Sequence, residues 1–224
     1  MTLRGALAAL TLLAAACQQP ALAQDEAVLA PAPRVSANET GTRATAIFAG
    51  GCFWGIEGVF SHTNGVISAV SGYHGGSAST ARYRQVVTGT TGHAESVRVV
   101  YNPQVVSYDQ LLRIFFSVGA DPTTLNYQGP DRGTHYRSAL VPMNREQRRV
   151  ATAYLAQMEE SGVWDDPIVT RIENFQRFYE AEDYHQDYML HNPTSGYIMR
   201  WDAPKVEALQ ELFPGLYRRT FRTG

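Results

Sequence analysis

Segments with the periodicity of strands alternate with segments of helical periodicity along residues 43–224. The apolar run Thr45–Ala49 predicts a buried strand that stops at Gly50-Gly51, and the helical spacing of the apolar residues that follow predicts a helix beginning near Cys52. The helical segments come in long and short pairs rather than as a regular series. This favours an α/β (α+β) fold, a two-layer sandwich in which helices pack on one face of a mixed sheet, over a doubly wound parallel sheet.

Turn and capping residues set the limits of further elements. Ser107 and Gln110 form a capping-box pattern ahead of one helix, and Asn144 and Gln147 repeat this pattern ahead of a longer helix that Gly162 ends. The same reasoning predicts strands at Gly65–Gly72, Ser96–Tyr101, Tyr136–Val141 and, at a sheet edge, Val169–Phe175, a loop over 121–133 and a short helix over Glu182–His191.

The first 23 residues have the pattern of a secretory signal. Arg4 precedes the apolar run Ala6–Ala16, and a short polar stretch then ends in the small residues Ala21-Leu22-Ala23. The apolar run is too short to span a bilayer as a helix. We therefore expect residues 1–23 to be an export signal and the protein to be periplasmic.

Cys17 leaves a second interpretation of the N-terminus open. The sequence Ala14-Ala15-Ala16-Cys17 resembles a lipoprotein processing site, which would leave a lipidated Cys17 as a membrane anchor. The following stretch is rich in Ala and Pro and has no periodicity, which predicts a flexible linker over 24–42 ahead of one domain over 43–224.

Composition excludes several classes of function. Charged residues make up 18% of the 224 residues and the formal net charge is -2, without the clustered Lys and Arg of nucleic-acid-binding domains. The Gly-rich stretches match neither a dinucleotide fingerprint nor a phosphate loop, and the histidines lack the spacing of metal ligands. We expect no nucleic-acid partner, no metal and no nucleotide cofactor. His185 is interpreted as a helix residue with a local hydrogen bond.

Cys52 is the one cysteine outside the signal segment, which excludes a disulfide scaffold. A strand-to-helix turn places its side chain at a helix N-terminus, where free N–H groups and the helix dipole favour a thiolate. The alternative is a buried, inert cysteine that only fills the turn. A lone thiol in an oxidising compartment favours the reactive interpretation.

The functional interpretation of several other residues depends on whether their side chains are buried. Phe53 and Trp54 follow the cysteine and point in different directions, so that either one is core and the other partly exposed, or both form an aromatic wall suited to a thioether. Glu95 lies before an alternating strand and would donate a proton only if burial raises its pKa. The polar run Gly129–Ser138 and, more weakly, Tyr83 are further candidates because loops on a rigid sheet often carry function.

Five separated motifs lie between about Thr45 and about Asn192. They are Gly51-Cys52-Phe53-Trp54-Gly55, Gly72-Tyr73-His74-Gly75-Gly76, Gly92-His93-Ala94-Glu95, Gly133-Thr134-His135-Tyr136-Arg137-Ser138 and Ala181-Glu182-Asp183-Tyr184-His185-Gln186. In this order and at this spacing they resemble the A-type peptide methionine sulfoxide reductases. The five together are far more specific than any one of them.

The resemblance implies a fold and a reaction. The fold is a two-layer sandwich related to the ferredoxin-like group, with the catalytic domain at 43–224. In the reaction, Cys52 matches the nucleophile that attacks the sulfur of the S epimer of methionine sulfoxide, in proteins and also in the free amino acid. Methionine leaves and a sulfenic acid remains on the cysteine. Glu95 matches the acid that protonates the sulfoxide oxygen, which is a poor leaving group until it is protonated.

The resemblance also assigns the groups around the sulfoxide. Tyr83 and Tyr136 match the hydroxyls that hold the oxygen, and Asp131 matches a carboxylate that helps to organise the site. Phe53 and Trp54 match the pocket for the terminal methyl group of the substrate.

The sequence departs from the family at its C-terminal end. Many members carry further cysteines there that convert the sulfenic acid to a disulfide, whereas no cysteine follows Cys52. We therefore expect an external thiol reductant, either a thioredoxin-like protein or a small thiol. Oxidised exported proteins are the expected substrates, and the enzyme is expected to be a monomer.

Two other functions remain open on the residues alone. Cys52 could serve a cysteine hydrolase if His93 or His135 acted as its base. The aromatic pair Phe53–Trp54 could serve a binding module that holds methionine or its sulfoxide without turning it over.

Overall fold

The computed structural model describes residues 27–224. The expected signal segment, including Cys17, lies outside these residues. Within 27–224, no helix combines the length and the apolar character that crossing a membrane requires.

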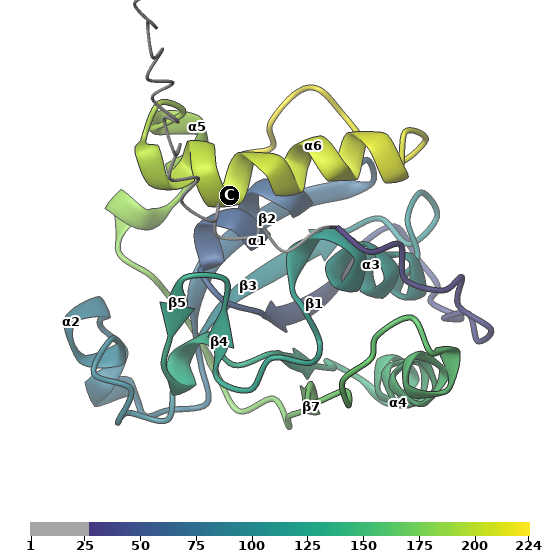
Figure 1. The fold of residues 1–224 in the computed structure, drawn as a ribbon, viewed down its shortest axis with the longest axis horizontal. Helices are drawn as coiled ribbons and strands as arrows, with labels where there is room; N and C mark the ends of the chain where they lie inside the picture. The colour runs from purple at the N-terminus through teal and green to yellow at the C-terminus, as the bar shows by residue number, and fades with distance from the viewer. Residues whose placement is uncertain (1–26) are drawn as a thin grey trace, which may run out of the picture.

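A six-stranded mixed sheet runs through the molecule in the order β7-β6-β1-β3-β2-β8 (Figure 1). Its strands are β1 (Ala44–Ala49), β2 (Val66–His74), β3 (Ala94–Tyr101), β6 (Ala139–Val141), β7 (Arg171–Ile172) and β8 (Phe178–Glu180). β6 and β7 pair in parallel, and the other pairs are antiparallel. Ala46 lies opposite Val99 and Phe48 opposite Val97, so the apolar side chains of neighbouring strands share one face.

The principal helices form the second layer on this face. The helices are α1 (Phe53–Ser61), α2 (Tyr83–Val86), α3 (Tyr108–Ile114), α4 (Arg145–Ser161), α5 (Tyr188–His191) and α6 (Ala203–Leu212). The ring of Phe48 lies 4.7 Å from that of Phe60 in α1 and 5.3 Å from that of Phe115, between centroids. Helix α6 packs on α1 and covers the end of the molecule where β1 leads into α1 (Figure 1). The structure confirms the two-layer α/β sandwich with a mixed sheet.

The predicted helix ends agree with the structure. The Ser107 hydroxyl and the Gln110 side chain form a complete capping box at the start of α3. Asn144 Oδ1 accepts the backbone N–H of Gln147 at 2.8 Å at the start of α4. Gly162 ends α4 in the left-handed conformation that favours glycine, with φ +64°.

Three segments differ from their predicted form. The expected loop over 121–133 contains a two-stranded hairpin, β4 (Tyr127–Gln128) with β5 (Asp131–Arg132). The expected strand Tyr136–Val141 is shorter, because a 3₁₀ turn occupies Thr134–Tyr136. The helix expected over Glu182–His191 is broken into a 3₁₀ turn and α5, since Asp187 between them has a positive φ of 50°.

The stretch expected to be a flexible linker instead lies against the body over the residues that are described, 27–42. Ala30 is fully buried and its N–H donates to Ser117 Oγ at 2.9 Å. The N–H of Ala37 donates to Asp109 Oδ1 at 2.9 Å. This segment is held by hydrogen bonds from its backbone to helix side chains, and it has no apolar stripe of its own. Apolar periodicity in the sequence could therefore not predict its position.

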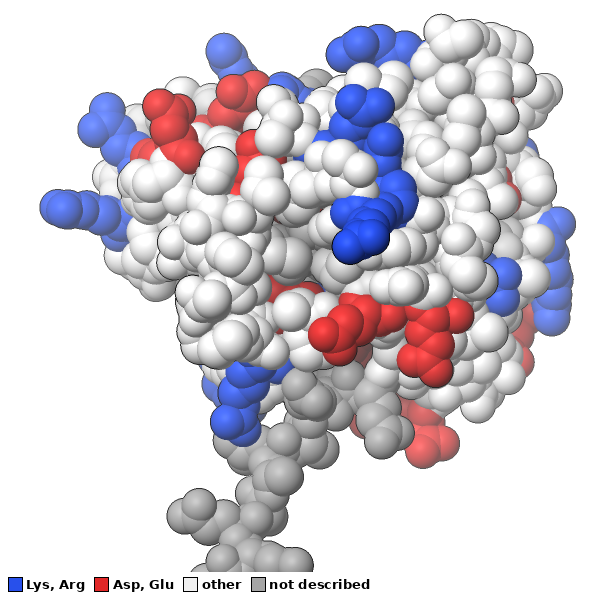
Figure 2. Space-filling model, turned by 90° about the horizontal axis from the view of Figure 1, so that it is seen from above, with Lys and Arg blue, Asp and Glu red and all other residues white. Residues whose placement is uncertain are grey.

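Charge is distributed in small groups on the face seen from above. Figure 2 shows separate clusters of acidic and basic side chains there, with uncharged surface between them. This arrangement agrees with the formal net charge of -2.

Candidate active site

The turn between β1 and α1 places Cys52 at the start of a helix. Gly51 has a φ of +89°, and a Cβ atom at this position would lie 2.6 Å from the Gln128 side chain. Only glycine therefore allows this close approach to the 121–133 loop. Cys52 is the N-cap residue of α1 and is 7% exposed.

The surroundings of Cys52 raise the pKa of its thiol well above the usual value. Burial is the largest cause, followed by the electrostatic effect of the nearby carboxyl groups of Asp202, Glu95 and Asp131, while a hydrogen bond from the Trp54 backbone lowers it. The direction of this shift is opposite to the expectation that the helix N-terminus favours a thiolate. Desolvation and the nearby carboxyl groups favour the thiol in the resting enzyme.

Glu95 is buried, which is the condition for its expected role as an acid. It lies on β3, is 2% exposed, and accepts the Phe53 N–H on Oε2 at 3.1 Å. Burial raises the pKa of Glu95 to about 8; the Phe53 N–H lowers it, and the charges of Asp131 and Asp202 raise it further. At neutral pH this side chain is a carboxylic acid that holds a transferable proton.

A cavity of about 190 Å³ brings together the site residues predicted from the sequence. Its lining consists of Cys52, Phe53, Trp54, Tyr83, Glu95, Asp131, Tyr136 and Tyr197. The cavity therefore combines a thiol, a buried acid, phenolic hydroxyls and aromatic walls. Tyr197 is the one member of this set that the sequence reasoning missed.

The tyrosine hydroxyls of the cavity stay protonated at neutral pH. Burial raises the pKa of Tyr83 to about 12, and burial together with the carboxyl groups of Glu95 and Asp131 raises the pKa of Tyr136. Tyr83 opens the short helix α2, and its N–H donates to Glu182 Oε1 at 2.9 Å. Both hydroxyls can therefore donate hydrogen bonds to an oxygen bound in the cavity.

Tyr197 holds the carboxylate of Asp131 through a hydrogen bond from its hydroxyl to Oδ2. Burial raises the pKa of Asp131, and this hydrogen bond and the charge of Lys205 lower it. The pairing orients Asp131 beside the cavity rather than toward solvent.

The two aromatic residues after the cysteine have different environments. Phe53 is fully buried in the core, whereas Trp54 is partly exposed. The Trp54 ring stacks on Tyr188, with centroids 3.7 Å apart and an interplanar angle of 8°. Its Nε1–H donates to His185 Nδ1 at 3.2 Å. Trp54 is therefore held in one orientation as a wall of the cavity.

His185 makes the local hydrogen bond that the sequence suggested, from its backbone N–H to the carbonyl of Glu182 at 2.8 Å, but its ring also belongs to the site. Its ring is buried, lies 5.0 Å from the Phe53 ring and 4.5 Å from the Tyr83 ring, and burial lowers its pKa. Because Nδ1 accepts the hydrogen bond from Trp54 Nε1–H, the neutral ring carries its own proton on Nε2. The sequence signal that could have identified His185 as a residue that positions Trp54 is its place in the motif Ala181–Gln186.

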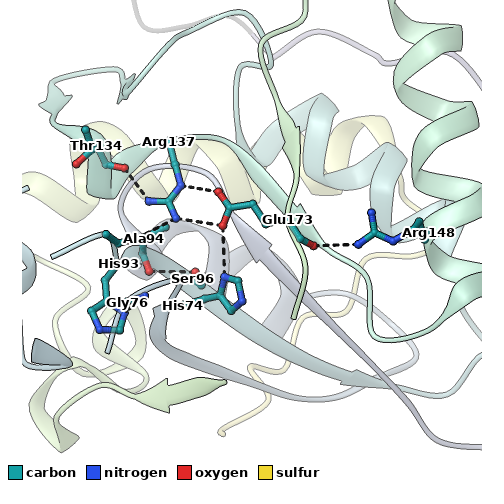
Figure 3. A network of polar contacts seen from close by, with 10 residues as sticks. His74, Gly76, His93, Ala94, Ser96, Thr134, Arg137, Arg148 and Glu173 are labelled. Atoms are coloured by element: carbon teal, nitrogen blue, oxygen red, sulfur yellow. Dashed lines mark hydrogen bonds and ion pairs between the residues drawn. The ribbon is translucent and has the colours of Figure 1, made fainter. Parts of the chain in front are cut away.

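A network behind the cavity connects three of the sequence motifs (Figure 3). Arg137 Nε donates to Glu173 Oε1 at 2.7 Å, and His74 Nδ1 lies 3.5 Å from Glu173 Oε2. Arg137 Nη2 also donates to the carbonyl of Gly92 at 3.2 Å. The network therefore fixes the 3₁₀ turn that carries Tyr136 against the strands that carry the other site residues.

The histidines required by the hydrolase interpretation lie elsewhere. Neither His93 nor His135 lines the cavity that contains Cys52. His93 accepts the Gly76 N–H on Nδ1 at 3.2 Å, and its Nε2 lies 3.0 Å from the Ser77 carbonyl. Residues 27–224 contain no group of three or more His, Cys, Asp or Glu side chains arranged to hold a metal ion.

Comparison with known proteins identifies the family. The family model for peptide methionine sulfoxide reductase matches residues 44–214. The chain is 54% identical over 173 residues to peptide methionine sulfoxide reductase MsrA 2 of Mesorhizobium japonicum, covering 77% of this chain and 89% of the relative. It is 47% identical over 187 residues to MsrA 2 of Synechocystis, covering 82% and 87%.

Solved structures agree with this match. Reduced Mxr1 from Saccharomyces cerevisiae superposes with a TM-score of 0.60 at 32% identity, covering 73% of this chain and 93% of that chain. Methionine sulfoxide reductase A of Corynebacterium diphtheriae superposes with a TM-score of 0.58 at 30% identity, covering 78% and 92%. With this sequence match, this fold and a thiol beside a buried acid, the chain belongs to the peptide methionine sulfoxide reductase family.

Proposed function

We propose that this enzyme reduces the S epimer of methionine sulfoxide to methionine through a sulfenic acid on Cys52. The observation that carries the proposal is the shared cavity of the Cys52 thiol and the buried acid of Glu95. A nucleophilic sulfur and a proton donor on either side of one S–O bond are what this reduction requires.

The proposed step balances in atoms and electrons. The Cys52 sulfur forms a bond to the sulfoxide sulfur, the Glu95 proton passes to the sulfoxide oxygen, and the proton of the Cys52 thiol replaces it on Glu95. The hydroxyl then moves from the substrate sulfur to the Cys52 sulfur: the substrate S–O bond and the new S–S bond break, an S–O bond to Cys52 forms, and methionine is released. The sulfoxide sulfur is reduced and the cysteine sulfur is oxidised to a sulfenic acid.

Stereochemical choice follows from two fixed sides of the cavity. The Tyr83 and Tyr136 hydroxyls donate to the sulfoxide oxygen, and Phe53 and Trp54 receive the methyl group, since sulfur and methyl groups pack well on aromatic rings. When the oxygen and the methyl group are held in these positions, the sulfur of only one sulfoxide epimer is oriented for attack by Cys52. Protein-bound methionine sulfoxide is the proposed substrate, with the free amino acid also accepted.

Reactivation requires a thiol from another molecule. No cysteine follows Cys52, so a sulfenic acid there meets an external thiolate, which resolves it through a mixed disulfide. A thioredoxin-like protein or a small thiol supplies the electrons, and the protein needs no prosthetic group.

The N-terminal sequence supports export of the enzyme and repair of oxidised exported proteins as its role. Residues 1–23 would be removed as a signal, or Cys17 would be lipidated; the mass of the mature protein purified from membrane and soluble fractions distinguishes the two. We propose that the enzyme acts as a monomer, which its sedimentation velocity would test.

Turnover of the separated sulfoxide epimers with dithiothreitol tests the proposed reaction. The S epimer should yield methionine and the R epimer should not, and Cys52→Ser should abolish turnover in a folded protein. Equal consumption of the two epimers would contradict the assignment.

A further inference from the structure

Cys52 lies where two cavities meet. The second cavity, of about 540 Å³, shares Cys52, Asp131 and Tyr197 with the smaller one. Two π-helical turns, Phe115–Gly119 and Ile198–Asp202, contribute to its lining. Such turns are rare and occur frequently at functional sites. Cys52 therefore also lines a cavity large enough to admit a second molecule beside the substrate cavity.

Asp202 is a carboxyl group in this larger cavity that has no structural role in its own helix. It is 1% exposed, and its Oδ2 has no hydrogen-bond partner among the described residues. Although it is the N-cap residue of α6, its side chain makes no capping hydrogen bond. Instead the carboxyl group packs on Gly55, where a Cβ atom would lie 2.3 Å from Asp202 Oδ1.

A buried polar atom without a partner is costly to a protein and calls for an explanation, such as a catalytic role. The glycine of the motif Gly51–Gly55 provides the room for this carboxyl group. Of the neighbouring charges, that of Asp202 acts most strongly on the Cys52 thiol. Asp202 thus lines the same cavity as Cys52 and lies against the first turn of the helix that follows it.

Asp202 titrates near neutrality. Burial raises its pKa to about 7; Lys205 lowers it and Asp131 raises it. Lys205 Nζ donates to the carbonyl of Gly119 at 3.1 Å and does not form an ion pair with Asp202. The titratable and charged groups that share these two cavities are Cys52, Tyr83, Glu95, Asp121, Asp131, Tyr136, Tyr197, Arg200, Lys205, Glu207 and Glu211.

The second half of the catalytic cycle needs a proton. When a thiolate attacks a sulfenic acid, the hydroxyl leaves far more readily as water than as hydroxide, so an acid beside the sulfur accelerates the step. We propose that an external thiol enters through the larger cavity and that Asp202 donates the proton to the hydroxyl that leaves Cys52. This inference rests on the sulfenic acid cycle proposed above.

The step balances as follows. The external thiolate sulfur forms a disulfide bond with Cys52, the S–O bond of the sulfenic acid breaks, and the hydroxyl leaves as water with the Asp202 proton. The Cys52 sulfur is reduced and the external sulfur is oxidised. A second thiol then releases Cys52 as a thiolate by thiol–disulfide exchange, and its proton restores the acid of Asp202. Cys52 takes up from solvent the proton that the first thiol lost when it ionised.

Separate measurement of the two half-reactions tests the proposal. In Asp202→Asn, one equivalent of S sulfoxide without reductant should still produce one methionine per enzyme, because Glu95 supplies the proton in that step. Mixing of the isolated sulfenic acid form with 2-mercaptoethanol should then show a resolution rate lowered by about 10²-fold, within the range of general acid catalysis. The sulfenic acid that remains is counted by dimedone labelling and intact mass.

The pH profile separates proton donation from a structural role. Expressed per attacking thiolate, the wild-type resolution rate should fall as the pH rises through about 7, where Asp202 loses its proton. The Asp202→Asn rate should be low and flat over this range. Glu207→Gln, which removes an exposed carboxylate from the same cavity, is the matched control and should follow the wild type.

Each other outcome overturns the inference. An unchanged resolution rate in Asp202→Asn would do so, and so would an equal loss of methionine formation and resolution. If Glu95→Gln slows both half-reactions while Asp202→Asn slows neither, Glu95 donates both protons. Should Asp202→Asn fail to fold, the wild-type pH profile still decides, since a rate per thiolate that does not fall near pH 7 contradicts the proposal. Failure of the wild type to form methionine would instead contradict the proposed function.

Discussion

Glu95 Oε2 accepts the backbone N–H of Phe53 at 3.1 Å, which ties the carboxyl group on β3 to the first turn of the helix that Cys52 begins. The bond holds the acid and the thiol in one cavity while burial keeps the acid protonated at neutral pH. The pair supplies the two groups on which the proposed reaction depends.

Replacement of Glu95 by Gln should retain a hydrogen bond to Phe53 N–H through the amide oxygen and remove the transferable proton. General acid catalysis is typically worth ~10²–10⁴-fold, so sulfenic acid formation in a single turnover should slow by a factor in that range. Rapid-quench detection of methionine measures this rate. A wild-type rate in folded Glu95→Gln would show that another group donates the proton.

The pH dependence of the same step should carry the signature of Glu95. Its pKa is raised to about 8 by burial, so the acid form is present below this pH and is lost as the pH rises through it. The rate of sulfenic acid formation should therefore fall above about pH 8 in the wild type. This decline should be missing in Glu95→Gln, and its persistence there would assign it to a different group.

Trp54 should contribute to substrate binding through its fixed orientation. Trp54→Ala removes the wall that stacks on Tyr188 at 3.7 Å and leaves His185 Nδ1 without its donor. We expect KM for a methionine sulfoxide peptide to rise at least about tenfold, because aromatic contacts with sulfur and methyl groups are worth ~0.3–1.5 kcal/mol each and burial of apolar area adds to them. Tyr184→Ala, at an exposed neighbour of His185, is the matched control. Equal changes in KM for the two variants would contradict the proposed contribution of Trp54 to substrate binding.

Arg137→Met should lower the stability of the fold by about 1.5–3 kcal/mol, the range for hydrogen bonds to charged groups. The substitution removes the hydrogen bonds that Arg137 donates to the Glu173 carboxylate and to the Gly92 carbonyl, so that His74 is the remaining partner of that carboxylate (Figure 3). Urea unfolding monitored by circular dichroism measures the change. Arg149→Met, which breaks an exposed ion pair with Glu146, should have little effect.

The effect of Arg137→Met should depend on pH in a defined window. Burial raises the pKa of Glu173, but contacts with His74 and Arg137 outweigh it and lower the pKa to about 2, against an ordinary value of 4.5. The ionised Glu173 thus contributes its full stability above about pH 4.5, and this contribution is lost as the pH falls toward about 2. The stability difference between wild type and variant should shrink over that interval. A constant difference from pH 7 to pH 3 would contradict the account of this network.

The sequence contains enough information to predict the sheet, the caps and most of the site. Apolar periodicity and glycines set β1 and the start of α1, and the motifs around Cys52, Glu95 and Tyr136 converge in one cavity. These predictions succeed because each depends on residues close together in the chain or on a motif read as a unit.

Predictions failed where distant segments decide the outcome. The helix N-terminus near Cys52 is local and favours a thiolate, but the raised pKa depends on burial and on Asp202, 150 residues later. Tyr197 and Asp202 belong to no motif and reach the site only because α6 folds onto α1. The segment 27–42 depends on hydrogen bonds to α3 and α4, which its own composition does not encode.

Reaction of the mature enzyme with one equivalent of the S sulfoxide, without reductant, tests the central claim most directly. Intact mass, free-thiol content and dimedone labelling are measured on the same sample. We predict one methionine formed, one thiol lost and a dimedone adduct on Cys52. Methionine formed with the Cys52 thiol intact would contradict the account, and so would a Cys17–Cys52 disulfide in place of the sulfenic acid, because the N-terminal segment would then be the resolving arm.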